Sequence, residues 1–214
     1  MIYLKDSFNL EPASPATRDQ FVESVETRLL PALSEQGARL VGGWFAHEEW
    51  FTQIVHVTEF DDASGLDRYR EASQADSMLA KAQAELASLA PERRAEVLEP
   101  LGPVPASTLR EAIDASAKEP VGVYTFAILE VNTGSMDRFS ALLSAAASAL
   151  PIVASWRDVA GNPNRVIDLW KGDTGKSGYQ PTNDRTDAFF EPLREVAPRE
   201  KMMRLHSMPY SPLR

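Results

Sequence analysis

Two stretches of the chain share one pattern of apolar and polar positions. The segment 53–61 reads QIVHVTEFD and is matched without a gap by 165–173, RVIDLWKGD, since 165 − 53 and 173 − 61 both equal 112. Trp44 and Trp156 keep this offset (156 − 44 = 112). Short runs of β-branched and aromatic residues bounded by turn residues are typical of strands. The pattern therefore predicts a β-hairpin that occurs twice.

Strand and helix periodicities alternate along the first half. An apolar stripe at helical spacing predicts a first helix that begins at Ser14 and ends at Gly37. Pro31 lies within this stripe and removes a backbone donor, so we expect the helix to loosen around Thr27. The other elements expected up to residue 105 are strands 2–10, 38–46, 50–60 and 100–105 and helices 62–90 and 91–98.

The alternation starts again after residue 120. The elements expected there are strands 121–131, 152–159, 165–171 and 201–210 and helices 135–146 and 187–196. The polar, alanine-rich stretch 107–119 is interpreted as a linker. We therefore expect a first repeat at 1–110, a linker at 111–120 and a second repeat at 121–214. The glycine-rich segment 172–183 replaces a helix, so the second repeat is expected to diverge there.

Each half then has the order β-α-β-β-α-β, which is the ferredoxin-like arrangement. Such a sheet carries helices on one face and must cover the other face if that face is apolar. Successive side chains of a strand point to opposite faces of the sheet, and the duplicated strands have apolar residues at both odd and even positions. This pattern predicts that both faces of the sheet are buried. The expected fold is α+β, with two ferredoxin-like repeats packed sheet to sheet as an intrachain α+β barrel, a pseudo-dimer.

Charge and composition exclude several classes of partner. The formal net charge of −9 argues against nucleic acid, whose phosphates need a basic face, and no polybasic segment suits an anionic membrane. No cysteine is present, which excludes disulfides and thiolate metal sites. No apolar run approaches the roughly 20 residues that span a bilayer, and the N-terminus does not resemble a signal peptide. A cytoplasmic protein is expected.

Two titratable residues fall at the same position of the repeated strand. His56 could act as a general base near neutral pH, or could be a core histidine with a hydrogen-bonded ring. Asp168 is its counterpart, and an ionised carboxylate in an apolar strand must be paired, neutralised or solvated. Arg157 or Arg165 could pair with it structurally; catalysis is the alternative.

The remaining candidates are less specific. His206, in the last expected strand, could approach Tyr124 of the first strand of its own half. The tryptophans of the two hairpins are either core residues or the wall of a pocket for a flat or apolar molecule; the substrate-binding candidates are Trp44, Tyr124, Trp156, Arg157 and Trp170. Three histidines without metal-ligand spacing predict no metal site.

Several short motifs resemble one known family. PAL at 31–33, GARLVGGW at 37–44, VHV at 55–57 and the terminal PYSPL at 209–213 are similar to motifs of the NIPSNAP family, within the dimeric α+β barrel superfamily. DLW at 168–170 matches the same hairpin strand, with aspartate in place of histidine. In that family a single copy usually dimerises, so the resemblance implies a pseudo-dimer within one chain, which could pair further as a homodimer.

The resemblance implies fold more directly than activity, because the superfamily includes cofactor-free monooxygenases, cyclases, isomerases and haem enzymes. We expect an enzyme without a cofactor that acts by acid–base chemistry on a small apolar or aromatic metabolite. His56 would be the base, with Asp168 or His206 as the second titratable group. The alternative is a non-catalytic module that binds a small molecule or a protein.

Overall fold

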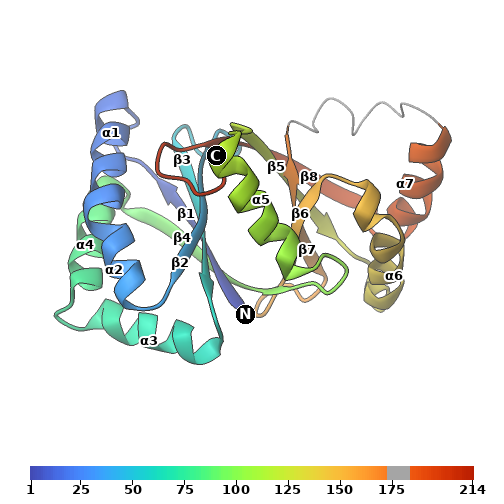
Figure 1. The fold of residues 1–214 in the computed structure, drawn as a ribbon, viewed down its shortest axis with the longest axis horizontal. Helices are drawn as coiled ribbons and strands as arrows, with labels where there is room; N and C mark the ends of the chain where they lie inside the picture. Colours follow the sequence, from blue (N-terminus) through green and yellow to red (C-terminus); the bar gives the residue numbers. More distant parts are fainter. Residues whose placement is uncertain (173–183) are drawn as a thin grey trace. The chain divides into compact units, whose positions relative to one another are not determined.

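The computed structural model describes residues 1–172 and 184–214, with the backbone alone for residues 184–189. Strands and helices alternate in the first part of the chain (Figure 1). These elements are β1 (Ile2–Asn9), α1 (Pro15–Ser24), the π-helical turn η1 (Val25–Leu29), α2 (Leu30–Glu35), β2 (Arg39–Ala46), β3 (Gln53–Phe60), α3 (Ala63–Gln74), α4 (Met78–Leu89) and β4 (Glu92–Pro100).

The second part repeats the alternation after one additional helix. Its elements are α5 (Ala106–Lys118), β5 (Val123–Glu130), α6 (Met136–Ala146), the short 3-10 turn η2 (Ala147–Ala149), β6 (Ile152–Asp158), β7 (Arg165–Lys171), α7 (Asp184–Val196) and β8 (Arg199–Ser207). None of the helices in the described ranges has the length and apolarity needed to cross a bilayer.

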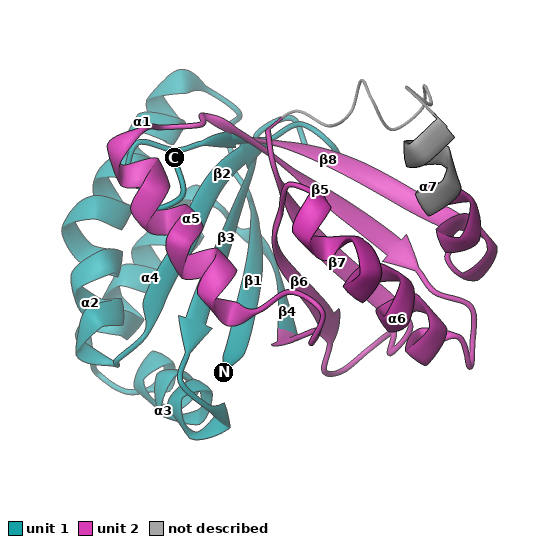
Figure 2. Ribbon diagram, turned by 45° about the vertical axis from the view of Figure 1, so that its right-hand side comes forward, with its two compact units in different colours: residues 1–97, 206–214 teal, residues 98–205 magenta. Residues whose placement is uncertain are grey.

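The chain divides into two compact units (Figure 2). Unit 1 comprises residues 1–97 together with 206–214, and unit 2 comprises residues 98–205. The last nine residues, which begin with the final two residues of β8, therefore belong with the first part of the chain. In unit 1, α1, α2 and α4 lie over one face of β1 and β3 (Figure 1).

The strands form a closed, eight-stranded barrel within the described residues, with the hydrogen-bonded order β1-β3-β2-β8-β5-β7-β6-β4. Every strand pair whose register is defined is antiparallel. A mixed α/β barrel was predicted, and this coarse prediction is confirmed. All eight residues of β3 are buried, which agrees with the apolar residues at both parities of that strand.

The two hairpins carry the same irregularity. The register of β2 against β3 shifts between Leu40 and Gly42, and that of β6 against β7 shifts between Ile152 and Ala154. These positions keep the offset of the sequence pattern, since 152 − 40 and 154 − 42 both equal 112. A β-bulge inserts one residue into a strand and bends it, so its position is a specific feature of a hairpin.

The first helix loosens where the sequence predicts. Residues 25–29 form the π-helical turn, in which the Leu30 N–H donates to the Val25 carbonyl five residues earlier. Pro31 cannot donate to the carbonyl of Thr27, and a π turn accommodates this missing bond. Gly37 has a φ of +67° and ends the helical segment in the left-handed conformation that glycine adopts without strain.

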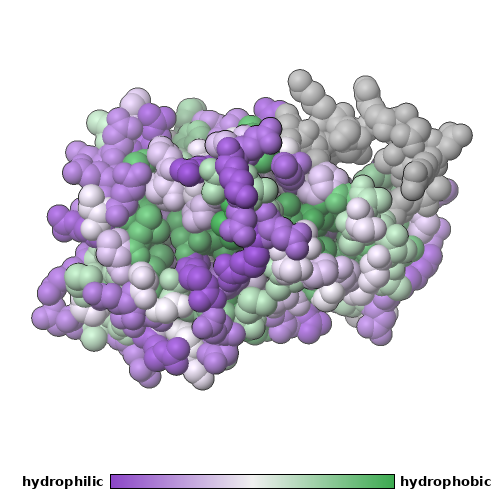
Figure 3. Space-filling model, in the orientation of Figure 1, coloured by the Kyte–Doolittle hydropathy of each residue, from purple (hydrophilic) through white to green (hydrophobic). Residues whose placement is uncertain are grey.

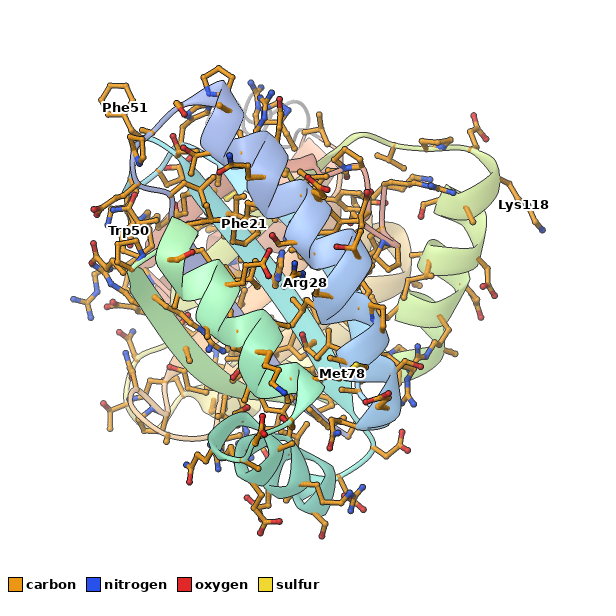
Figure 4. The ribbon with its side chains drawn as sticks, turned by 90° about the vertical axis from the view of Figure 1, so that its left-hand side faces the viewer. Phe21, Arg28, Trp50, Phe51, Met78 and Lys118 are labelled. Atoms are coloured by element: carbon orange, nitrogen blue, oxygen red, sulfur yellow. The ribbon has the colours of Figure 1, made fainter. Side chains whose placement is uncertain are left out.

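Each unit has its own apolar core. The core of unit 1 joins the inner stripe of α1 to α2 with residues of β1, β3, α3 and α4, and it also includes Met208 and Tyr210 of the terminal segment. Figure 4 shows Phe21 between α1 and α4. The core of unit 2 is built from β5, β6, β7, α6 and α7. The outward helix surfaces on the face shown in Figure 3 are largely hydrophilic.

Three segments differ from the sequence-based expectation. The expected strand 100–105 is a turn region, because the fourth strand of this half is β4, which ends at Pro100. Residues 92–98 were predicted as a charged helix, and that prediction is wrong, because they form most of β4. Strand pairing overrides the helical propensity: Lys5 is bound to Glu96, and Arg93 pairs with Asp6. The segment 106–118, interpreted as a linker, is helix α5, as its alanine-rich composition allows. The expected divergent segment was 172–183, and its residues 173–183 are not among those that the structure describes.

Candidate functional site

A cavity of about 70 Å³ lies in unit 1, between the strands and the helices that cover them. Its walls are apolar, and its polar groups come from β1, β3, α3, α4 and β4. The polar lining residues are Asp6, His56, Thr58, Tyr69, Gln83 and Arg93, and the apolar ones are Phe8, Leu29, Leu33, Leu86, Ala87, Ala90 and Pro91. An apolar pocket with a few convergent polar groups is the usual form of a small-molecule site.

Asp6 and Arg93 form an ion pair at this cavity. Arg93 donates from Nε to Oδ1 of Asp6 at 2.9 Å, and its Nη2 lies 2.8 Å from the same oxygen. Asp6 is buried, whereas the Arg93 side chain is one-third exposed. Burial raises the pKa of the Asp6 carboxyl, and the guanidinium opposes this shift by charge and hydrogen bonding. Both nitrogens of Arg93 face Oδ1, and among the described residues none donates a hydrogen bond to Oδ2.

Tyr69 and Gln83 extend this polar cluster. The Gln83 amide donates to the Tyr69 hydroxyl at 2.7 Å, and Tyr69 is also hydrogen-bonded to Arg93. Burial raises the pKa of the Tyr69 hydroxyl, and the charge of Asp6 adds to that shift. The phenol therefore remains protonated at physiological pH and can serve as a hydrogen-bond donor.

His56 lies directly opposite Asp6, because the antiparallel register of β1 and β3 pairs the two residues. Its ring is 2 % exposed and is enclosed edge-to-face by Phe8, with Phe21 at a centroid distance of 5.9 Å. Burial lowers the pKa of the imidazole to about 3, and the positive charge of Arg93 adds to this shift. His56 is thus a neutral imidazole at physiological pH, rather than a base poised near neutrality.

The terminal segment supplies the partner of His56. The Tyr210 hydroxyl lies 2.8 Å from Nε2 of His56, and both side chains are buried. Gly43 makes this contact sterically feasible, since a Cβ there would lie 2.5 Å from Cε2 of Tyr210. The segment is fixed to β2 by backbone bonds, including Met208 N–H to the Gly43 carbonyl at 2.9 Å.

In unit 2, Asp168 has different surroundings from those of His56. It lies opposite Ala127 on β5 and Ser155 on β6, where His56 lies opposite Asp6 and Gly43. Ser155 donates from Oγ to Oδ1 of Asp168 at 2.5 Å. Burial raises the pKa of Asp168 to about 7, which the bond from Ser155 opposes. The carboxyl is therefore largely protonated below neutral pH.

The arginine partners predicted for Asp168 are engaged elsewhere. Arg157 pairs with Glu99 at 2.6 Å, and Arg165 pairs with Asp158 at 2.9 Å. The prediction of a structural ion pair at Asp168 is therefore wrong, and neutralisation by burial takes its place. Arg157 itself is exposed on β6, opposite Glu99 of β4.

The aromatic candidates are mostly core residues. Trp44, Trp156 and Tyr124 are each at most 1 % exposed, whereas Trp170 is partly buried against the core of unit 2. Trp44 does not line the cavity of unit 1. His206 is exposed and lies opposite Phe45 of β2, beside a surface groove of about 470 Å³. The structure therefore brings His56, but not Trp44 or His206, to the cavity.

Sequence reasoning missed most of the cavity's polar residues. Asp6 shares strand parity with the buried Leu4 and Phe8, so a charge on the apolar side of a strand was a detectable signal. Tyr69, Gln83 and Arg93 carry no comparable signal, because three separate elements bring them together. Within the described residues no group of three or more histidine, aspartate or glutamate side chains could hold a metal ion.

Comparison with solved structures identifies the fold. Two chains that are each named "putative monooxygenase" share it: one from Lactobacillus acidophilus NCFM has a TM-score of 0.62, 12% identity and coverage of 95% of this chain and 92% of that one. The other, from Fusobacterium nucleatum subsp. nucleatum, has a TM-score of 0.59, 8% identity and coverage of 96% and 91%. An anthrone oxidase-like protein has a TM-score of 0.56, 9% identity and coverage of 99% and 93%. At such identities the likeness concerns the fold.

No curated protein matches the chain in sequence. The family model that matches is NIPSNAP, over residues 12–103, which include five of the six polar cavity residues, His56, Thr58, Tyr69, Gln83 and Arg93. Asp6 and Tyr210 lie outside the matched range. Over residues 12–103 the chain therefore matches the NIPSNAP family, within a fold that it shares with α+β barrel proteins.

Proposed function

We propose that the protein is a cofactor-independent enzyme that acts on a small molecule by acid–base chemistry in the cavity of unit 1. The single observation that carries this proposal is the register pair Asp6 and His56, which presents a carboxylate and a neutral imidazole to one apolar cavity. A pair of titratable groups whose environments set different roles is a recurrent arrangement for moving protons.

The roles differ from those that the sequence suggested. A base is most effective when its pKa lies near the working pH, so an imidazole with a pKa of about 3 is a weak acceptor. Asp6 is the better acceptor, since burial raises its pKa and Oδ2 has no bond from the described residues. His56 would then polarise an oxygen atom of the substrate as a neutral hydrogen-bond donor.

Arg93 and Tyr69 support this assignment. Arg93 holds one carboxylate oxygen of Asp6 from two directions, which fixes the orientation of the other. Tyr69 is bonded to both Gln83 and Arg93 and offers a protonated hydroxyl at the cavity. Catalytic groups need such support to keep a productive geometry.

The size of the cavity narrows the ligand class. A water molecule needs roughly 10–15 Å³ of such volume, and a cavity of about 150 Å³ holds benzene. At about 70 Å³ the cavity suits a compact molecule of a few non-hydrogen atoms better than an aromatic metabolite. Because Arg93 is neutralised by Asp6, the site also favours an uncharged ligand. A small carbonyl compound with a weakly acidic C–H bond meets both conditions.

The test is proton exchange in D₂O. The full chain is incubated with a panel of small ketones, aldehydes and diketones, and loss of the signal of the proton next to the carbonyl is followed by NMR. Removing a general base reduces the rate by about 10²–10⁴-fold. We expect the D6N variant to lose exchange by at least about 10²-fold. The matched control is D67N, on the exposed surface of α3.

A non-catalytic binding module is the second candidate. The pairing of Asp6 with Arg93 and of Tyr69 with Gln83 favours it, because the two charges already neutralise each other and the Tyr69 oxygen already accepts a hydrogen bond without a substrate. Thermal stabilisation of the protein by members of the panel, without any exchange that depends on Asp6, would select this function. Neither exchange nor binding would overturn both proposals for the cavity.

We also propose that a duplication produced the chain. Around the barrel, the order β4-β1-β3-β2 is followed by β8-β5-β7-β6, the same order in both halves. The matching bulges and the constant offset of 112 support this origin. Unit 2 has Ala127 where unit 1 has Asp6, so the proposed proton acceptor belongs to unit 1 alone.

A further inference from the structure

A buried hydrogen bond connects the cavity to the last segment of the chain. The Tyr210 hydroxyl lies 2.8 Å from Nε2 of His56, and the two rings meet edge-to-face at 5.5 Å. Among the described residues, no other group is hydrogen-bonded to this hydroxyl or to the His56 ring. Within the described part of the chain, this is therefore the only hydrogen bond that can determine which ring nitrogen of His56 carries the proton.

The two neutral tautomers of His56 satisfy this contact unequally. If Nε2 carried the proton, it would donate to the Tyr210 oxygen, and the Tyr210 hydroxyl hydrogen would have no acceptor among the described residues. If Nδ1 carries the proton, Tyr210 donates to Nε2, and the one remaining donor is the Nδ1 N–H, which lies away from Tyr210 on a ring that lines the cavity, where a water molecule or a ligand can accept its bond. Leaving a buried donor without an acceptor costs about 1–3 kcal/mol. Because His56 lines the cavity and Tyr210 does not, the form protonated at Nδ1 places the unpaired donor where it can be solvated or bound, and this form is favoured.

The surroundings of Tyr210 hold the hydroxyl in this position. The segment that carries it is bonded to β2 through Met208 N–H to the Gly43 carbonyl and through Gly43 N–H to Oγ of Ser211 at 3.0 Å. The Tyr210 ring is 9 % exposed and belongs to the apolar core of unit 1. The hydroxyl also cannot ionise near neutral pH, because burial raises the pKa of Tyr210 well above 10.

We propose that Tyr210 is a positioning residue that holds His56 in the tautomer protonated at Nδ1, so that the ring presents an N–H donor to the cavity. His56 lines the cavity, whereas the edge of its ring that includes Cδ2 and Nε2 faces Gly43 and Tyr210. The terminal segment, outside the matched family range, thereby determines the polarity that the cavity offers to a ligand.

The tautomer of His56 also indicates which donor and acceptor groups a ligand of the cavity must carry. This inference about the ligand rests on the proposed function of the cavity. A donor at His56 and an acceptor at Oδ2 of Asp6 require a ligand with an acceptor oxygen facing β3 and a hydrogen facing β1. A carbonyl oxygen next to an acidic C–H bond has this arrangement. A cationic amine lacks the acceptor that His56 would need.

The tautomer is measured directly by ¹⁵N NMR of the ligand-free full chain. The chain has three histidines, and His47 and His206 are exposed, so the double variant H47Q/H206Q leaves only His56 in the spectrum. We expect Nδ1 to give the signal of a protonated nitrogen and Nε2 that of a hydrogen-bonded acceptor at pH 7. A protonated Nε2 would overturn the proposal, whatever the exchange experiment shows.

The Y210F change in the same background tests the cause. It keeps the ring and removes the hydroxyl that donates to Nε2, and we expect the share of molecules protonated at Nε2 to rise, since that form predominates for free neutral histidine. The matched control is Y124F, which removes another buried hydroxyl, in unit 2. An unchanged tautomer in Y210F would overturn the role of Tyr210. If Y210F does not fold, the spectrum of the chain with Tyr210 still decides the tautomer.

Discussion

A side-chain carbon on Gly43 would lie 2.5 Å from Cε2 of Tyr210 and 3.2 Å from Cδ2 of His56. The missing side chain therefore lets the tyrosine ring approach β2 closely enough for its hydroxyl to reach the imidazole. In unit 2, Ser155 occupies the position that corresponds to Gly43, and its hydroxyl itself binds the carboxyl of Asp168. One residue at the same place in each hairpin thus selects which partner the central titratable group receives.

The G43A change is expected to destabilise the protein by about 1–3 kcal/mol, because an extra methyl group in a packed site forces its neighbours to shift. Urea unfolding measures the difference. Gly102 provides the control, since a Cβ there meets nothing within 4 Å, and G102A should remain within about 0.5 kcal/mol of the original chain. Equal stability of G43A and G102A would show that Tyr210 is not tightly packed against β2.

Acid should destabilise the protein through His56. Its pKa is about 3 in the fold and about 6.5 when unfolded, so the unfolded chain takes up a proton first as the pH falls. The stability that the neutral ring contributes is complete above pH 6.5 and is lost towards pH 3. Between pH 7 and pH 4 this loss is about 3 kcal/mol. Urea unfolding should show that the free energy of unfolding of H56Q falls by that much less than the free energy of the original chain between pH 7 and pH 4. An identical pH profile in the two proteins would contradict a buried neutral imidazole.

Asp168 should have the opposite effect. Its pKa is about 7 in the fold and about 3.9 when unfolded, so the folded chain retains a proton that the unfolded chain releases. The stability linked to the protonated carboxyl is complete below pH 3.9 and is lost as the pH rises through 7. Relative to D168N, the original chain should lose on the order of 4 kcal/mol between pH 4 and pH 8.

Unfolding of D168N and the original chain at several pH values tests this expectation. D114N, on the exposed surface of α5, is the matched control for removing a carboxylate from unit 2. A constant difference between D168N and the original chain across this range would mean that the buried carboxyl is already ionised at low pH.

The pair of Asp6 and Arg93 should show strong coupling. Removing one member of a buried ion pair costs about 3–5 kcal/mol, because the other charge stays uncompensated. For R93Q we expect about 2–4 kcal/mol, since the Arg93 side chain is one-third exposed and water can partly replace it. In a double-mutant cycle with D6N, the double variant should be less destabilised than the sum of the single changes. Additive losses would argue against a direct interaction.

The local pattern of the chain determined the elements near the repeat. The offset of 112 located both hairpins, because alternating apolar residues and turn signals act over short distances. Pro31 indicated the π turn and Gly37 the helix end, since each fixes its own backbone conformation. The sequence also indicated that His56 and Asp168 are equivalent, and that a carboxylate at Asp168 could not remain both ionised and unpaired.

Tertiary structure decided what these residues do. Arg93 lies on a strand rather than on the predicted helix, and only the pairing of distant segments brings it to Asp6. Burial and the charge of Arg93 keep the expected base His56 as a neutral imidazole, and Tyr210, 154 residues away, supplies its hydrogen-bond partner. The two arginines expected to pair with Asp168 instead pair with other carboxylates, Arg157 with Glu99 and Arg165 with Asp158. Burial and charge at a site depend on side chains from several elements, and no local pattern encodes which of them meet.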